Sequence, residues 1–173
     1  MYCSTSIKKP RFSPWNIRFL NVNEQEALDV EGHDPLIVLA KISSFEVKSI
    51  LVEIDSSVDI LTVYTFYKLG FKDAKLKKAN PVYGFANQPI IVKGSVILSV
   101  FLGDMEYMLK KIVEFLVVHH PTAYNPIFEE LIMKLTKMVV ATFYMVVKFP
   151  MPTNEGYMKC DQKTAYECHI ASL

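Results

Sequence analysis

The chain has 173 residues, of which 51% are hydrophobic and 21% are charged, and its formal net charge is +1. A chain of this length and hydrophobicity can bury the core of one domain, so disorder by composition is excluded. The near-neutral charge argues against a dedicated nucleic-acid binder, which carries a basic excess. The lysines that cluster between residues 72 and 78 are explained by a solvated loop.

Membrane and export signals are weak in this sequence. The longest apolar run, residues 138–147, is about half as long as the roughly 20 residues that a spanning helix needs, so we assign it to a core. Residues 1–14 carry three basic side chains but no apolar stretch after them, so no signal peptide is predicted. Cys3, Cys160 and Cys168 are too few and too scattered for a disulfide framework. These features predict an intracellular, cytoplasmic protein with no membrane partner.

The composition of the first half of the chain changes at Pro35. Residues 1–31 are mixed in character, and we predict that they form a partly ordered N-terminal arm. Two runs rich in β-branched residues, 36–42 and 47–52, are separated by only four residues, which is the spacing of a hairpin. A polar break follows at residues 53–57. Residues 58–69 have apolar side chains at helical spacing and are predicted to form a short helix that ends at Gly70.

The second half of the chain is dominated by strand-like segments. Residues 81–86 are rich in turn formers. Strands are predicted at residues 89–92, 95–102, 107–109, 112–118 and 139–149, with a short amphipathic helix at 129–138. Pro150 and Pro152 close the compact region, so the domain is predicted to span residues 32–152, with a polar tail over 153–173. Many short strands and two short helices predict a small all-β, barrel-like domain.

Residues 51–61 resemble a known active-site loop. They read L-V-E-I-D-S-S-V-D-I-L, and the pattern L-V-D-x-G-S-S-A-D-I-L belongs to the proteases of plant gypsy-class retrotransposons. Further similarity follows in the same order: residues 83–85 resemble the flap motif V-G-F, 92–96 the strand after it, and 115–118 with 123–127 the motifs F-L-V-V and A-Y-N-A-I-L-G-R-P. The chain therefore resembles, over roughly residues 17–173, the retropepsin-like aspartic protease domain of a plant gypsy-class (LTR) retrotransposon Gag-Pol polyprotein.

This resemblance implies a small closed barrel of the retropepsin or acid-protease type, with two short helices, that forms a homodimer. Each subunit gives one aspartate, and the two carboxyl groups share a proton and activate the water that attacks a peptide bond. The implied partners are a peptide or polyprotein substrate and a second copy of the chain, with no nucleic acid, metal or cofactor. The implied substrate-binding flap closes over the peptide; its residues are Tyr83, Gly84, Phe85 and Ala86.

The chain departs from the family pattern at three constrained positions. Glu53 stands at the position of the catalytic aspartate, and Asp55 stands where the pattern has glycine. Glu129 replaces the glycine of the second motif. Ser56 and Ser57 match loop residues that support the carboxylate through hydrogen bonds. A shifted reading in which Asp55 is catalytic is disfavoured, because it breaks the ungapped match on both sides.

We therefore predict a retrotransposon-derived, aspartic endopeptidase-like domain whose activity is impaired. Glutamate extends the carboxyl by one methylene, about 1.5 Å of bond length, and a Cβ at residue 55 resists the close approach of two loops. The alternatives that stay open are a non-catalytic peptide-binding or dimerisation module and a non-functional transposon remnant.

Other candidate sites have plainer explanations. His119 and His120 are adjacent on an extended chain, so their side chains point apart and indicate a loop exit rather than a metal pair. A zinc site at Cys160, Cys168 and His169 lacks a fourth ligand. Asp59 matches a structural acid that caps amides at the start of the helix predicted over 58–69. Four aromatic residues are predicted to lie in the core: Tyr64, Phe66, Tyr67 and Phe71.

Overall fold

The structure is a computed structural model that describes residues 16–17, 35–54, 57–83, 89–104, 108–120, 122–152 and 154–171. The predicted N-terminal arm, residues 1–31, lies outside the described residues except for residues 16–17.

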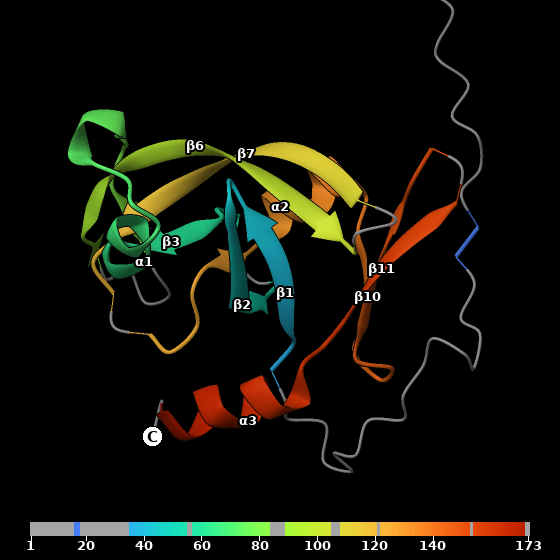
Figure 1. Cartoon of the computed structure of the whole chain (residues 1–173). Helices are drawn as coiled ribbons and strands as arrows, with labels where there is room; N and C mark the ends of the chain where they lie inside the picture. The colour runs from blue at the N-terminus through green and yellow to red at the C-terminus, as the bar shows by residue number, and fades with distance from the viewer. Residues whose placement is uncertain are drawn as a thin grey trace, which may run out of the picture.

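A closed barrel forms the body of the protein, with the strand order β1-β2-β8-β3-β7-β6 (Figure 1). Its strands are β1 (Ile37–Ile42), β2 (Phe45–Val52), β3 (Ile60–Thr62), β6 (Val92–Gly103), β7 (Met108–Val118) and β8 (Ile127–Phe128). The small all-β closed barrel predicted from the sequence is thereby confirmed. The predicted hairpin over residues 36–52 is also confirmed, because β1 and β2 pair in antiparallel register.

The core fills the inside of this barrel. On the long β6–β7 hairpin, alternate side chains point inward, so that Val96 faces Phe115 and Leu98 faces Val113 across the two strands. The Phe115 ring lies 6.2 Å from the ring of Phe128 on β8, measured between centroids. The continuous apolar interior therefore reaches β8, the strand that borders the candidate site.

A second sheet packs beside the barrel and has the order β11-β10-β9. Its strands are β9 (Val139–Ala141), β10 (Val146–Pro150) and β11 (Glu155–Lys159). The extended segment predicted over residues 139–149 is thus two strands, because Met145 adopts a positive φ of 49° in the turn between them. A small hairpin is formed by β4 (Val82–Tyr83) and β5 (Pro89–Ile90).

In the residues that the structure describes, three α-helices accompany the strands: α1 (Val63–Lys68), α2 (Glu130–Thr136) and α3 (Gln162–Ala171), with a 3₁₀ turn η1 (Asp73–Lys75). The helix predicted over 58–69 is shorter than expected, because residues 60–62 extend as β3 and pair with β7 and β8. The helix predicted over 129–138 corresponds to α2. The sequence did not predict α3, whose apolar residues do not gather on one face.

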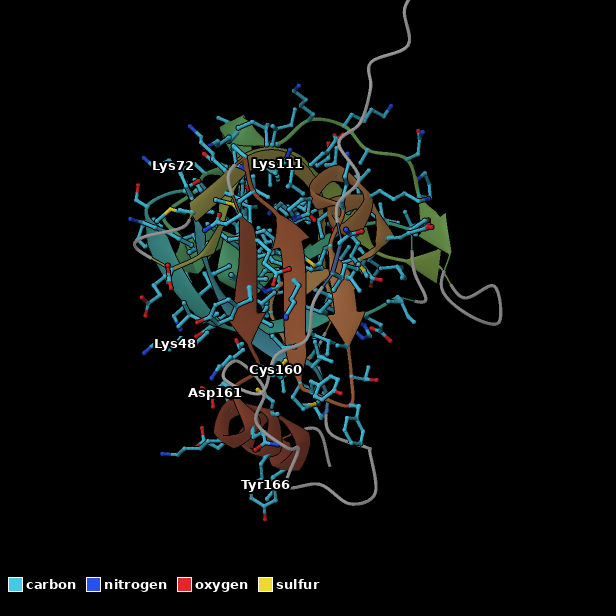
Figure 2. The ribbon with its side chains drawn as sticks, turned by 90° about the vertical axis from the view of Figure 1, so that its right-hand side faces the viewer. Lys48, Lys72, Lys111, Cys160, Asp161 and Tyr166 are labelled. Carbon is cyan, nitrogen blue, oxygen red and sulfur yellow. The ribbon has the colours of Figure 1, made fainter. Side chains whose placement is uncertain are left out.

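The C-terminal segment is attached to the barrel. The amide of Asp161 donates to the carbonyl of Ile37 on β1, and Ala165 and Cys168 of α3 are buried. Figure 2 shows Cys160 and Asp161 at the junction between β11 and α3, with Tyr166 on the side of α3 away from the sheet. Asp161 begins the helix by accepting the Thr164 amide at 3.1 Å. Residues of the predicted polar tail thus form a strand and a helix that contact the barrel.

Gly156 allows β11 to pack against β10, and alanine there is expected to destabilise the fold. It pairs with Phe149, and a Cβ at residue 156 would lie 2.3 Å from the Cε2 atom of this buried ring. Overpacking of this kind costs about 1–3 kcal/mol. Urea unfolding of Gly156→Ala measures the loss, with the exposed Lys159→Ala on the same strand as the control, expected within about 0.5 kcal/mol of wild type. An unchanged midpoint for Gly156→Ala would contradict this packing.

Candidate active site

The candidate active site is built around β8, which lies between β2 and β3. Leu51 and Val52 of β2 pair in parallel with Ile127 and Phe128, and Ile60 of β3 pairs with Ile127 from the other side. In the barrel, β8 therefore separates β2 from β3, the two strands that flank residues 53–59. The amide of Glu53 donates to the carbonyl of Phe128 at 3.0 Å. Glu53 and Asp59 therefore both lie beside Phe128 and Glu129, the residues that precede α2.

Asn125 fastens the loop's two flanking segments to each other. Its amide donates to the carbonyl of Ser49 on β2 at 2.8 Å. Its side-chain oxygen accepts the amide of Thr62 at 3.1 Å, and its side-chain nitrogen donates to the Thr62 hydroxyl. The same hydroxyl accepts the Thr65 amide and so caps α1. Sequence reasoning found Asn125 only as a letter of the motif A-Y-N and missed this bridging role.

Asp59 is a buried carboxyl in the floor of the site. Its Oδ1 accepts the amide of Glu129 at 2.7 Å, and among the described residues its Oδ2 has no hydrogen-bond partner. Burial raises the pKa of Asp59 to about 7, against the opposing effect of the Glu129 amide. The predicted role of Asp59 as a cap of the following helix is wrong: Thr62 caps α1, and Asp59 instead bonds the residue that precedes α2, because β3 separates Asp59 from α1.

The structure describes part of the predicted catalytic loop. Glu53 and Ser57 are both exposed to solvent, whereas Asp55 and Ser56 lie outside the described residues. Glu53 stands at the end of β2 beside Phe128, and its neighbour Ile54 is 67% exposed. The side chain of Glu129, where the pattern has glycine, is only 2% exposed.

The predicted flap is described only at its base. Tyr83 belongs to β4, where its backbone pairs with Pro89 of β5. Gly84, Phe85 and Ala86 lie outside the described residues. We call the unit made by β4 and β5 the flap hairpin.

The histidine pair and the aromatic residues predicted to lie in the core have well-defined positions. His119 and His120 are exposed where β7 ends, and they border a surface pocket of about 460 Å³ with Thr62, Val63, Tyr64 and Val118. The expectation that four aromatic residues lie in the core is correct for Phe66, which is buried. It is wrong for Tyr64 and Tyr67, which are largely exposed because α1 presents them to solvent.

The two described cysteines, Cys160 and Cys168, form no disulfide. Cys168 donates to the carbonyl of Ala123 at 3.7 Å, and burial raises the pKa of Cys160 to about 12, so that its thiol stays protonated. Within the part of the chain that the structure describes, no three histidine, cysteine or acidic side chains come together as metal ligands. In the same residues, no helix has the length and apolar character needed to cross a membrane.

The barrel, its strand order and the loop beside β8 define a retropepsin-like fold. Comparison with solved structures agrees: the chain is similar to the retroviral protease-like domain of Ddi1 from Leishmania major, with a TM-score of 0.53 and 17% sequence identity. This match covers 72% of the present chain and 94% of that domain. At this identity, the likeness establishes the fold.

Two further solved structures match with lower scores. EIAV protease in complex with the inhibitor HBY-793 matches with a TM-score of 0.46 and 14% identity over 62% of this chain and 91% of that one. A retropepsin-like aspartic protease from Rickettsia conorii matches at 0.45 and 16% over 70% and 80%. Compared by sequence, the chain matches no protein-family model and no curated protein.

Proposed function

We propose that this chain is an aspartic endopeptidase-like domain of retropepsin type, derived from a plant gypsy-class retrotransposon polyprotein and impaired in catalysis. The observation that carries the proposal is the position of Glu53: it stands at the end of β2, against β8, in a retropepsin-like barrel. In the sequence pattern, this position holds the catalytic aspartate. The domain spans residues 32–152, and the segment 153–173 continues from it.

The impairment follows from the length of the side chain. A carboxyl displaced by about 1.5 Å in a site that depends on fixed geometry loses on the order of a hundredfold in rate. Two such loops facing each other in a dimer double the error. Asp55 adds a second carboxyl to each loop, and the repulsion between like charges raises the cost of bringing the loops together.

A homodimer is part of the proposal, because one loop per chain provides half of a catalytic pair. The exposed apolar side chain of Ile54, next to Glu53, supports this, since a second copy of the chain would cover it. The peptide substrate would lie between the paired loops and the flap hairpins. We further propose an intracellular location, which agrees with the lack of a disulfide at Cys160 and Cys168.

A second function is favoured by the burial of Glu129. A carboxyl side chain is enclosed beside Asp59, at a position where the pattern has glycine, and this suits a domain that keeps the fold without catalysis. The domain would then be a non-catalytic peptide-binding or dimerisation module, or a non-functional transposon remnant.

Incubation of the purified protein with an unbiased peptide library separates these readings. The library is sampled from acidic to neutral pH, with and without pepstatin, and cleavage is read by mass spectrometry. We expect the folded protein to give no pepstatin-sensitive cleavage, and circular dichroism on the same sample verifies the fold. Pepstatin-sensitive products would overturn the impairment and show that Glu53 or Asp55 assembles a working pair. Sedimentation of the same sample reports whether the dimer forms.

A further inference from the structure

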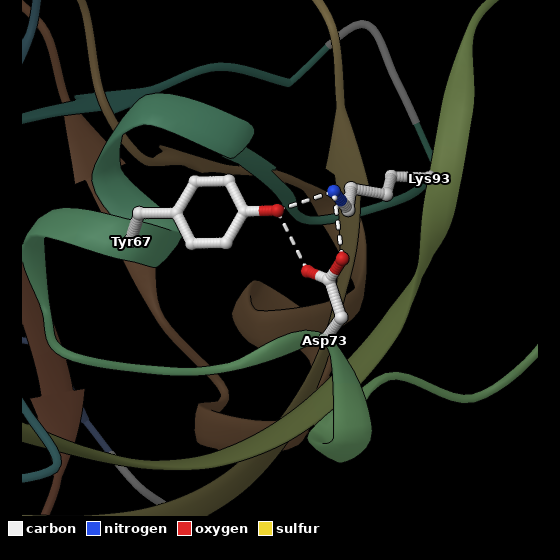
Figure 3. Close-up of polar contacts among 3 residues, drawn as sticks. All are labelled: Tyr67, Asp73 and Lys93. Atoms are coloured by element: carbon white, nitrogen blue, oxygen red, sulfur yellow. Dashed lines mark hydrogen bonds and ion pairs between the residues drawn. The ribbon is translucent and has the colours of Figure 1, made fainter.

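Three polar side chains from separate elements meet near the base of the flap hairpin (Figure 3). The hydroxyl of Tyr67 on α1 donates to Oδ1 of Asp73 in η1 at 2.7 Å. The Nζ atom of Lys93 on β6 donates to the Tyr67 hydroxyl and lies 3.2 Å from Oδ2 of Asp73. Each side chain thus contacts both of the others, which closes a ring of polar contacts.

Lys93 reaches this ring because of a bulge in β6. The register with β7 pairs Val92 with Val118 but Gly94 with Val117, so Lys93 is the extra residue. A bulge of this kind re-aims the side chain of the additional residue. Only 24% of the Lys93 side chain is exposed, and its Nζ atom lies 4.9 Å from the centre of the Tyr67 ring. The backbone of β6 therefore sets the direction of Lys93.

The segment that enters the flap hairpin is held at the same point of β6. Lys77 and Ser95 exchange two backbone hydrogen bonds of 2.8 and 2.9 Å. The approach is so close that a Cβ on Gly94 would lie 2.6 Å from the Lys77 carbonyl oxygen. Residue 77 precedes the hairpin and residues 93–95 follow it, so these contacts join its two ends.

We propose that Tyr67, Asp73 and Lys93 act as a clamp that positions the flap hairpin relative to α1. We call these residues the hairpin clamp. The first residue before α1, Thr62, bonds Asn125 beside the catalytic loop. The clamp therefore links the base of the flap hairpin to α1, the helix whose N-cap residue Thr62 is bonded to Asn125 in the site. That the hairpin covers a peptide rests on the proposed function, whereas the mechanical role of the clamp does not.

The charges of the clamp support one another. The hydrogen bond from Tyr67, followed by that from Lys93, lowers the pKa of Asp73, and the contacts with Tyr67 and Asp73 raise the pKa of Lys93. Both groups therefore keep their charges through the neutral range. They are positioning residues, since none of them belongs to the catalytic loop.

Hydrogen exchange on the full chain tests the clamp. The variants are Tyr67→Phe, which removes only the hydroxyl, and Lys93→Met, which keeps the apolar stem without the charge. We expect the amides of Lys77, Val82, Ile90 and Ser95 to exchange roughly twofold to fivefold faster in both variants. The amides of β1 and β2 should exchange as in wild type.

Lys75→Met is the matched control. Lys75 also lies in η1 and also stacks on an aromatic ring, with its Nζ atom 4.2 Å from the centre of Phe71, but its side chain makes no hydrogen bond or ion pair with the clamp residues. It should leave exchange at the hairpin base unchanged. Wild-type exchange rates in both clamp variants would overturn the proposal, and so would an equal acceleration in the control.

Pepstatin binding by the same proteins separates the clamp from the proposed function. If wild type binds pepstatin, a weaker affinity in the clamp variants, by about the factor seen in exchange, supports positioning of the hairpin over the ligand. Unchanged affinity despite faster exchange would overturn that positioning role. Faster exchange in the variants together with no binding by wild type supports the clamp and counts against the proposed peptide-binding function.

Discussion

Replacing Asp59 by asparagine is expected to make the protein more stable at neutral pH and to leave its stability near pH 4 almost unchanged. The folded protein holds the pKa of Asp59 at about 7 rather than the ordinary 3.8. Between these values the folded state binds more protons than the unfolded state, so the free energy of unfolding falls as the pH rises. The difference between the two pKa values of Asp59 corresponds to a loss of at most about 4 kcal/mol in the free energy of unfolding. Asparagine does not titrate, and its carbonyl oxygen can still accept the Glu129 amide.

Urea unfolding of wild type and Asp59→Asn at a series of pH values measures this effect. The difference between the two curves isolates Asp59 from the other groups that titrate in the same range. Asp161→Asn is the control of opposite sign. Thr164 holds the pKa of Asp161 below its ordinary value, so Asp161 contributes stability that is present above 3.8 and is lost as the pH falls. If the free energies of unfolding of wild type and Asp59→Asn changed in parallel with pH, the Asp59 carboxyl would not lower the stability of the folded protein at neutral pH, and the prediction would be wrong.

Restoring the three pattern positions together is expected to create peptidase activity. In the variant Glu53→Asp with Asp55→Gly and Glu129→Gly, the catalytic carboxyl moves back by one methylene, and the loops regain the freedom to meet. The third change removes a buried carboxyl but keeps the backbone amide that Asp59 accepts. Cleavage of the peptide library at acidic pH should rise by on the order of a hundredfold or more.

The control carries Glu53→Asn in place of Glu53→Asp, with the other two changes retained. It keeps the size of the side chain but has no carboxyl to share a proton, so it should be inactive. Activity in this control would point to a contaminating peptidase. No cleavage by a folded and dimeric restored protein would mean that the match between residues 51–61 and the catalytic loop is wrong.

Local patterns in the sequence predicted the parts of the fold that depend on neighbouring residues. The β1–β2 hairpin follows from two runs rich in β-branched residues at hairpin spacing. Apolar runs also predicted strands over residues 89–118, but as four shorter pieces rather than the long strands β6 and β7. The two-residue strand β8 has no such pattern, because its pairing with β2 depends on residues far away in the chain. Helix α3 was missed because its sequence has no apolar face, although Asp161 before Thr164 is a helix-start signal.

In the candidate site, too, the sequence predicted only the features that a local motif carries. Glu53 was found because a short motif identifies it, and its place at the end of β2 agrees with a strand followed by a polar break. The bond between Asp59 and the Glu129 amide could not be found, since it joins residues 70 positions apart. The clamp residues Tyr67, Asp73 and Lys93 carry no motif, and a bulge in β6 decides where Lys93 points. Tertiary pairing, rather than residue type, assembles these groups.

The parallel pairing of β2 with β8 also has a consequence for how the protein is made. The contact between Ser49 and Asn125 spans 76 residues, so it closes a loop that contains residues 53–59, the flap hairpin and the long strands β6 and β7. Closing so long a loop carries a high entropic cost, and contacts of this kind slow folding. On the ribosome, β1 and β2 can pair early. Glu53 and Asp59 lack their hydrogen-bond partners until Phe128 and Glu129 have been synthesised. The nascent chain would thus keep this site unassembled until almost the whole domain had been synthesised.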